Sequence, residues 1–203
     1  MTRKEFTPRE YQRLIFDHIN NLDRCAVWAD MGLGKTVASL TAIDAAHLAG
    51  ESHPTLIVAP LIVARDTWPD EARKWQHLSA LDVMPVIGSE AERRAALRFD
   101  AGVYAVNFEN LVWLTEHFGE RWPFRRVFVD ESRRLKSFRL KQGGKRTAAL
   151  GRLAHTKTKQ FVELTGAPAP NGLCDLWGQL WFIDGGRRLG RTYSSFTERW
   201  FRP

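Results

Sequence analysis

The chain has 203 residues, of which 44% are hydrophobic, and this size fits one domain with a sizeable core. No stretch approaches the roughly 18 apolar residues that cross a membrane, and no apolar segment follows residues 1–5 as in a signal peptide. Cys25 and Cys174 lack metal-binding spacing, which argues against a disulfide scaffold or a zinc site. We therefore expect an intracellular protein with no membrane partner.

Positive charge is concentrated in one segment. The formal net charge is +7, yet residues 132–162 contain no acid, so the rest of the chain is slightly acidic. A near-neutral body with one cationic segment is typical of a polyanion contact, because phosphate neutralisation releases counterions. A solvated charged surface gives the same pattern, and charge alone does not decide. The ten cations are Arg133, Arg134, Lys136, Arg139, Lys141, Lys145, Arg146, Arg152, Lys157 and Lys159.

Helical and strand-like patterns alternate along the chain. We expect strands over Cys25–Trp28, Thr55–Ala59, Val83–Ile87, Val103–Val106, Val127–Val129 and Phe161–Leu164. The first expected helix is capped by Thr7-Pro8-Arg9-Glu10 and runs to Leu22, and others run from Lys35 to Ala49, from the end of the second strand through Trp75, and from the cap Ser89-Glu90-Ala91-Glu92 to Phe99. A last helix is expected over Gly172–Ile183, with Leu173, Leu176, Trp177 and Leu180 on one face.

This alternation predicts an α/β fold with a mostly parallel sheet and helices on both sides. Residues 139–145 are the expected exposed loop, and no linker or internal repeat divides the chain. Trp68, Trp75, Trp177 and Trp181 have spacing that suits helix packing, so we expect them in the core or in interfaces. Such sheets bind ligands at the carboxyl ends of their strands.

A phosphate-binding loop follows the first expected strand, as Ala29-Asp30-Met31-Gly32-Leu33-Gly34-Lys35-Thr36. Its glycines allow backbone N–H groups to converge on phosphate oxygens, while Lys35 reaches the β and γ phosphates and the Thr36 hydroxyl binds Mg²⁺. The following helix adds its N-terminal dipole. A chance glycine-rich turn is the alternative, and the flanking strand and helix argue against it. We expect Met31, Gly32, Leu33, Gly34, Lys35 and Thr36 to contact ATP.

A second polar cluster ends the strand at Val127-Phe128-Val129-Asp130-Glu131. In P-loop enzymes an Asp at this position holds Mg²⁺, and a neighbouring Glu orients and deprotonates the attacking water. Adjacent acids are weak evidence by themselves and become strong beside an upstream P-loop. We predict Asp130 as a metal ligand and Glu131 as the base, with Lys35 as the third catalytic residue.

Together these motifs resemble the superfamily-two helicases, and within them the Swi/Snf-type DNA translocases and their bacterial and phage relatives. Residues 30–36 resemble motif I, in which the first general P-loop Gly is often absent. Asp130-Glu131-Ser132-Arg133 resembles the D-E-x-H box, with Arg133 at the usual His, and residues 164–171 are similar to motif III, L-T-G-T-P-x-x-N. The segments that resemble the remaining motifs are Phe6–Gln12, Leu56–Pro60 with Trp68, Glu71 and Trp75, and Asn107–Leu111.

This resemblance implies a RecA-like ATP-binding lobe spanning residues 1–203, using ATP and Mg²⁺ on a nucleic-acid track, usually double-stranded DNA. By the same match, Gln12 reads the adenine, although a helix-surface role fits it too. Thr165 and Gly166 couple the ATP state to the nucleic acid. Arg139, Lys141, Lys145 and Arg146 are the expected nucleic-acid contacts. The resemblance also places the protein in the cytoplasm of a bacterial cell or of a phage-infected host.

The family's engine needs a second RecA-like lobe, which supplies arginines to the γ-phosphate and is absent from this chain. Three explanations are open: a truncated protein, which we favour, a natural half protein, or a partner chain that supplies the other lobe. We expect the isolated lobe to bind ATP weakly and to hydrolyse it slowly. The alternatives are an idle single-lobe module that binds DNA or a partner protein, and a P-loop kinase or small NTPase. Intact Lys35, Thr36, Asp130 and Glu131 argue against the first, and the Thr165–Pro168 motif argues against the second.

Overall fold

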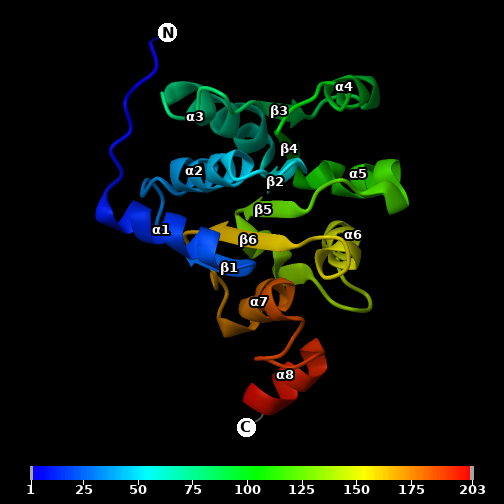
Figure 1. The fold of residues 1–203 in the computed structure, drawn as a ribbon. Helices are drawn as coiled ribbons and strands as arrows, with labels where there is room; N and C mark the ends of the chain where they lie inside the picture. The colour runs from blue at the N-terminus through cyan, green and yellow to red at the C-terminus, as the bar shows by residue number, and fades with distance from the viewer. Residues whose placement is uncertain (1, 202–203) are drawn as a thin grey trace.

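Six parallel strands form one sheet at the centre of the molecule (Figure 1). The computed structural model describes residues 2–201, so residues 1, 202 and 203 of the expected domain lie outside the described residues. The strands are β1 (Arg24–Trp28), β2 (Thr55–Ala59), β3 (Val83–Val86), β4 (Val103–Asn107), β5 (Arg126–Asp130) and β6 (Gln160–Thr165). Their order across the sheet is β1-β6-β5-β2-β4-β3. All six strands predicted from the sequence are therefore present.

Helices connect the strands and cover both faces of the sheet. They are α1 (Glu10–Asn21), α2 (Lys35–Leu48), α3 (Trp68–Lys74), α4 (Glu90–Ala96), α5 (Leu111–Phe118), α6 (Lys145–Ala154), α7 (Leu176–Asp184) and α8 (Tyr193–Trp200). One apolar cluster packs α1, α2 and α3 against the sheet through residues such as Ile19, Leu40 and Trp68. The other packs α5, α6 and α7 through residues such as Leu150 and Phe182.

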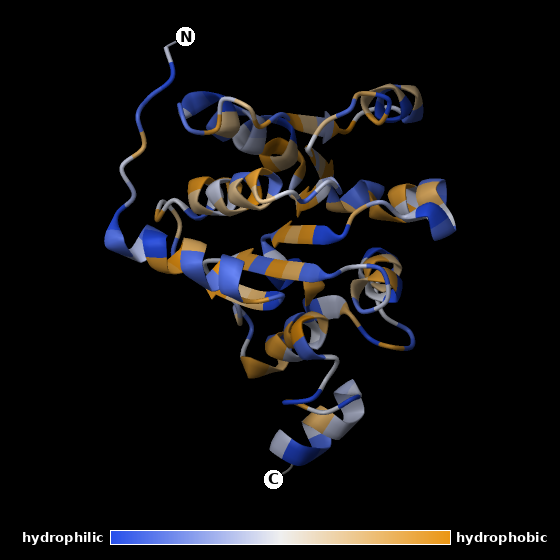
Figure 2. Ribbon diagram, viewed as in Figure 1, coloured by the Kyte–Doolittle hydropathy of each residue, from blue (hydrophilic) through white to orange (hydrophobic). Residues whose placement is uncertain are grey.

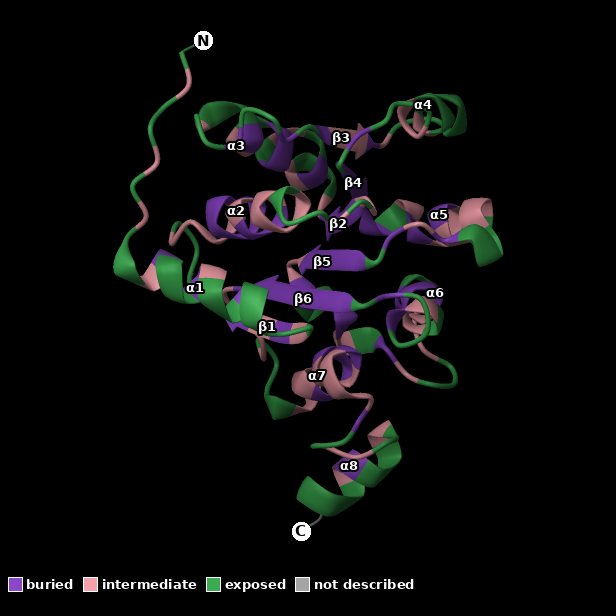
Figure 3. Ribbon diagram, viewed as in Figure 1, coloured by how far each residue is buried: buried purple, intermediate pink, exposed green. Residues whose placement is uncertain are grey.

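The strands are buried because both of their faces are covered. Every residue of β2, β4 and β6 is buried, and Figure 3 shows the sheet as the buried layer between more exposed helices. Hydrophobic residues dominate the same strands in Figure 2, as expected for a parallel sheet. The predicted three-layer α/β fold with a mostly parallel sheet is confirmed.

The start of α1 differs from the prediction. Thr7 and Pro8 lie before the helix, and Arg9 is the N-cap residue. The backbone N–H of Arg9 donates to the side-chain oxygen of Gln12 at 2.9 Å. Gln12 thus takes the capping position predicted for Glu10, and the helix starts two residues later than predicted.

Two further helix boundaries differ. The Ser89–Glu92 capping box forms as predicted, but α4 ends at Ala96 instead of Phe99 because the next amides tighten into turns. The helix expected from Gly172 begins at Leu176, after a 3₁₀ turn over Leu173–Asp175. Leu173 is therefore exposed and does not share the buried face of Trp177.

The helix after β2 contains one irregular turn. Residues Val63–Thr67 form a π-helical turn directly before α3, and the backbone N–H of Trp68 donates to the carbonyl of Val63. Such turns accommodate an extra residue and occur often at functional sites. Trp68, at the end of this turn, is fully buried.

Two expectations from composition concern the whole fold. None of the helices in the described part of the chain combines the length and the apolarity that a membrane span requires. Cys25 is buried, Cys174 is half-buried, and both are free thiols.

Candidate nucleotide site

The turn after β1, residues 29–36, is called the glycine turn here, and it leads directly into α2. Gly32 and Gly34 have φ angles of 81° and 72°, a left-handed backbone that glycine adopts without steric cost. Lys35 and Thr36 are the first two residues of α2, so the free N–H groups of this helix start point toward anything held in the turn. All the residues predicted to contact the phosphates lie in this short segment.

The Lys35 side chain folds back over the glycine turn. Its ammonium donates to the carbonyl oxygens of Ala29 at 2.6 Å and Asp30 at 3.0 Å. This geometry places the positive charge inside the turn, where a phosphate chain cradled by backbone N–H groups would lie.

Asp130 ends β5 and is held by two hydrogen-bond donors. The indole N–H of Trp68 donates to one carboxyl oxygen at 3.0 Å, and the backbone N–H of Glu131 donates to the other at 3.0 Å. Burial raises the pKa of the Asp130 carboxyl, while these two donors and the nearby ammonium of Lys35 oppose the rise. Glu131, which follows β5, lines one cavity together with Asp30 and Met31 of the glycine turn, so the end of β5 lies beside this turn.

Glu131 lies in an unusual backbone conformation. Its φ of 56° and ψ of 49° are left-handed, which only a small share of residues other than glycine adopt. Its carboxylate pairs with the guanidinium of Arg133, with Nε at 3.0 Å from Oε2. Strained residues of this kind cluster at active sites and switch regions.

β6 joins the two halves of the site because it lies between β1 and β5. The backbone N–H of Ala29 donates to the carbonyl of Thr165 at 3.1 Å, and the Thr165 hydroxyl accepts from the backbone N–H of Ala167 at 3.2 Å. A Cβ atom added to Gly166 would lie only 3.5 Å from the Met31 backbone nitrogen. The Thr165–Gly166 segment therefore touches the glycine turn directly.

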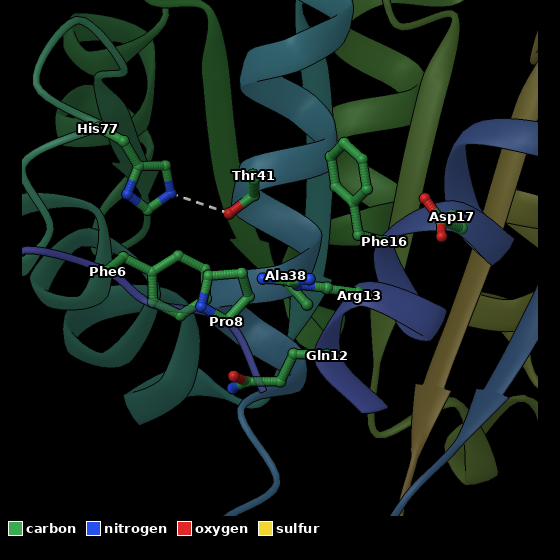
Figure 4. A pocket seen from close by; sticks show the side chains of 9 residues that line it. All are labelled: Phe6, Pro8, Gln12, Arg13, Phe16, Asp17, Ala38, Thr41 and His77. Atoms are coloured by element: carbon green, nitrogen blue, oxygen red, sulfur yellow. Dashed lines mark hydrogen bonds between the residues drawn. The ribbon is translucent and has the colours of Figure 1, made fainter. Parts of the chain in front are cut away.

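A cavity of about 440 Å³ lies beside Gln12, between α1, α2 and the N-terminal segment (Figure 4). The Gln12 amide packs against the glycine turn, since a Cβ atom on Gly34 would lie 2.1 Å from its nitrogen. Phe6 stacks on His77 with ring centroids 5.0 Å apart, and the His77 ring bonds to the Thr41 hydroxyl at 2.9 Å. The lining residues are Phe6, Pro8, Gln12, Arg13, Phe16, Asp17, Ala38, Thr41 and His77.

The structure places the cations of the basic segment, residues 132–162, in separate parts of the surface. A cavity of about 550 Å³ is lined by Arg134, Lys136, Lys145 and Arg146, together with Phe108, Ser137, Gly144 and Thr147. Lys141 is exposed on the preceding loop. Arg139 turns away, with its guanidinium 3.5 Å from the centre of the Tyr193 ring and bonded to the carbonyls of Lys136 and Phe138.

Acids from distant segments meet this basic segment. Glu109 lies 3.5 Å from Arg134 and 3.4 Å from Arg146, and Asp175 lies 3.3 Å from Lys136. Of the four predicted nucleic-acid contacts, the structure brings Lys145 and Arg146 together in one cavity and separates Arg139 from them.

The residues at the end of β5 fit Mg²⁺. Within residues 2–201, no three His, Cys, Asp or Glu side chains are grouped as a metal site. Mg²⁺ in nucleotide enzymes is held by one or two carboxylates, water and substrate phosphates, so it does not need such a cage. Asp130 and the Thr36 hydroxyl are oxygen donors of the right kind, and the Trp68 indole orients Asp130.

Two residues of this site were not assigned to it from the sequence. Trp68 was expected as a core or interface anchor in the helix that follows the motif Ia-like segment. No local pattern distinguishes an indole that bonds to a carboxylate 62 positions away. Arg133 was noted as a departure from a motif and as one of the ten cations of the basic segment, and not as a residue of this site. Its spacing of two residues from Glu131 is the one signal that points to a pairing.

Known proteins resemble this chain over almost all of its length. The sequence profile of the SNF2-related domain matches residues 18–203. Putative protein p41 of Acyrthosiphon pisum secondary endosymbiont phage 1 is 57% identical over 201 residues, which cover 98% of this chain and 44% of that protein. Helicase swr1 of Emericella nidulans is 31% identical over 192 residues, which cover 87% of this chain and 10% of that protein.

A solved structure agrees with these relatives. The Sulfolobus solfataricus SWI2/SNF2 ATPase core in complex with dsDNA matches with a TM-score of 0.78 and 25% identity, covering 95% of this chain and 38% of that one. This chain thus spans less than half the length of these relatives. Its sheet order, its flanking helices and this structural match define a RecA-like α/β fold. By sequence, the chain belongs to the SNF2-related domain family.

Proposed function

We propose that this chain is the ATP-binding lobe of a DNA-dependent ATPase that uses Mg-ATP hydrolysis to move on nucleic acid. The observation that carries the proposal is the meeting of three segments at one edge of the sheet. Lys35 lies on the glycine turn, Asp130 ends β5 and Glu131 follows it, and Thr165 bonds to the glycine turn from the strand between them. This is the arrangement that phosphoryl transfer to water requires.

The proposed mechanism divides the work among these residues. The N–H groups of the glycine turn and the ammonium of Lys35 hold the phosphates, while Gln12 and the cavity of Figure 4 hold the adenine. Glu131 accepts a proton from the water that attacks the terminal phosphate. Mg²⁺, when bound by Asp130 and Thr36, neutralises charge that develops on the phosphates.

Nucleic acid binds, in this proposal, at the cavity of the basic segment. Lys145 and Arg146 begin α6 and are exposed. Arg146 lies 3.4 Å from Glu109, so a phosphate competes with this carboxylate for its guanidinium. Contacts of this kind position the protein on DNA without reading its sequence. The solved core named above was determined with dsDNA, which supports duplex DNA as the partner.

A second RecA-like lobe completes the proposed engine, either on the same polypeptide or in trans. Arginines from outside a nucleotide site accelerate related NTPases by several orders of magnitude. Residues 1–203 form the N-terminal lobe in this proposal, and hydrolysis by this lobe without its partner is slow.

The testing experiment is ATP turnover by this chain with and without duplex DNA, beside the variants Glu131→Gln and Lys35→Ala. We expect slow turnover that DNA raises and that Glu131→Gln abolishes, with ATP binding lost in Lys35→Ala. If the affinity for ATP is unchanged in Lys35→Ala, the proposed nucleotide site is refuted and an idle binding module is favoured. Vigorous turnover by a strictly monomeric sample would refute the need for a second lobe.

The DNA face is tested separately by a salt titration of duplex binding. Replacing Lys145 or Arg146 by Ala lowers the slope of log affinity against log salt by about 0.9 for each phosphate that the variant no longer neutralises. Arg152→Ala is the matched control, because Arg152 is exposed on the same helix and does not line the cavity. Equal effects of all three changes would show that only net charge matters.

A further inference from the structure

Arg133 occupies the position at which the D-E-x-H box has His, and the proposed mechanism assigns it no role. The turn that carries it is well fixed. The backbone N–H of Arg134 donates to the Glu131 carbonyl at 3.0 Å, and the buried Ser132 hydroxyl bonds to the Gln179 amide oxygen at 3.2 Å. The Arg133 side chain is about half exposed, at 47%. A rigid turn therefore presents a side chain that has room to move.

This side chain lines a cavity of about 420 Å³ next to the glycine turn. The lining residues are Asp30, Met31, Glu131, Arg133, Gly166 and Ala167. The ammonium of Lys35 bonds to the Asp30 carbonyl at 3.0 Å, so the cavity begins where the lysine charge lies. A nucleotide whose phosphates lie along the glycine turn would direct its terminal phosphate into this space.

The charges around this cavity favour a role for Arg133. Asp30 and Glu131 are acidic, and Arg133 is the only cation among the described residues that line the cavity. A terminal phosphate entering there meets these two carboxylates and the Arg133 guanidinium, with the Lys35 ammonium at the start of the cavity. Arg133 already binds one anion, the Glu131 carboxylate, through Nε at 3.0 Å, and its planar fork of donors matches a phosphate as well as a carboxylate.

We propose that Arg133 binds the terminal phosphate of ATP from within the same lobe. The guanidinium exchanges the Glu131 carboxylate for the γ-phosphate, and this exchange leaves Glu131 free to accept the proton of the attacking water. The Glu131 carboxylate and the γ-phosphate thus compete for the same guanidinium. The inference rests on the proposed function, because it requires ATP on the glycine turn.

Equilibrium binding of ATP and ADP, each with Mg²⁺, tests the exchange without depending on turnover. A fluorescent ATP analogue is displaced by each unlabelled nucleotide from the chain and from Arg133→Gln. ATP affinity falls about tenfold, since a half-exposed charge-assisted hydrogen bond contributes less than a buried one. ADP affinity changes less than about twofold, because ADP lacks the γ-phosphate that Arg133 binds.

Two further variants make the exchange specific. Glu131→Gln removes the competing carboxylate, so ATP binds more tightly. In the double variant with Arg133→Gln, this gain is largely lost, which is a coupling that a double-mutant cycle measures. Arg133→Lys keeps the charge without the fork and gives an intermediate ATP affinity. Arg152→Gln controls for the loss of one exposed positive charge outside the cavity.

The outcomes separate the inference from the proposed function. Equal losses of ATP and ADP affinity in Arg133→Gln, or no loss in either, overturn the role of Arg133. A Glu131→Gln gain that persists fully without Arg133 also overturns the exchange. Circular dichroism confirms that each variant is folded. If Lys35→Ala leaves ATP binding intact, the nucleotide site itself is misplaced, and the inference falls with it.

Discussion

Glu163 is an acid in the middle of the central strand β6, and its burial has a measurable consequence. Its backbone neighbours are Ala26 on β1 and Val129 on β5. The side chain is fully buried, and within the described residues neither carboxyl oxygen has a hydrogen-bond partner. Burial raises the pKa of Glu163 well above its ordinary value of 4.5.

The direction of the pH effect follows from proton linkage. The unfolded chain releases the Glu163 proton near the ordinary pKa, whereas the folded chain keeps it to a higher pH. Stability from this group is therefore full below about pH 4.5 and is lost as the pH rises toward the folded pKa. The loss is at most about 1.4 kcal/mol per pH unit, or up to about 2.7 kcal/mol between pH 5 and pH 7.

Glu163→Leu removes this titration and keeps the site filled. We expect the stability difference between Glu163→Leu and the unmodified chain to grow in favour of the variant from pH 5 to pH 7. Urea unfolding at pH 5, 6 and 7, followed by Trp fluorescence with linear extrapolation, measures the free energy of unfolding. Glu116→Gln is the control for the loss of one carboxylate, because Glu116 is exposed on α5. Parallel pH curves for Glu163→Leu and the unmodified chain would refute the reasoning.

Two other changes test the nucleotide site. Trp68→Phe removes the indole donor from Asp130. The Mg²⁺ concentration needed for half-maximal nucleotide binding then rises about tenfold, as for other residues that orient metal ligands. An unchanged Mg²⁺ dependence would show that the hydrogen bond has no such effect. Gly34→Ala and Gly32→Ala each cost about 1–2 kcal/mol in thermal unfolding, because both backbones are left-handed. Only Gly34→Ala displaces the Gln12 amide and lowers the preference for ATP over GTP in competition binding, and an equal effect of Gly32→Ala would contradict this.

The strands were predictable because each is a short apolar run bounded by polar residues, a pattern that depends only on neighbours in sequence. Three helices were not predicted. In α6, Gly151 and Arg152 interrupt the apolar residues, and the start of the helix carries Lys145 and Arg146, so the charges hide its helical pattern. In α5 the apolar residues run consecutively as Leu-Val-Trp-Leu, which shows no helical period, and α8 has too few apolar residues to show one.

The candidate site was predictable where one segment carries the whole signature, as in the glycine turn and at the end of β5. Contacts between distant segments were not. The basic segment contains no acid of its own, yet Glu109 and Asp175 are brought to it by the ends of β4 and the start of α7. Composition indicates the sign of the charge on this surface, and only the fold shows how much of it is already neutralised.

The π-helical turn over Val63–Thr67 sets the direction in which Trp68 and the residues after it point from the helix axis. One residue more or less rotates everything beyond it by about 100° around the helix axis. With an ordinary α-helical turn at this point, the residue facing the end of β5 would be a neighbour of Trp68, and the indole would point elsewhere. A single insertion or deletion in a stretch with no catalytic residue of its own would thus change what orients Asp130. Alignments of this segment need to respect its length as strictly as they respect the motifs on either side.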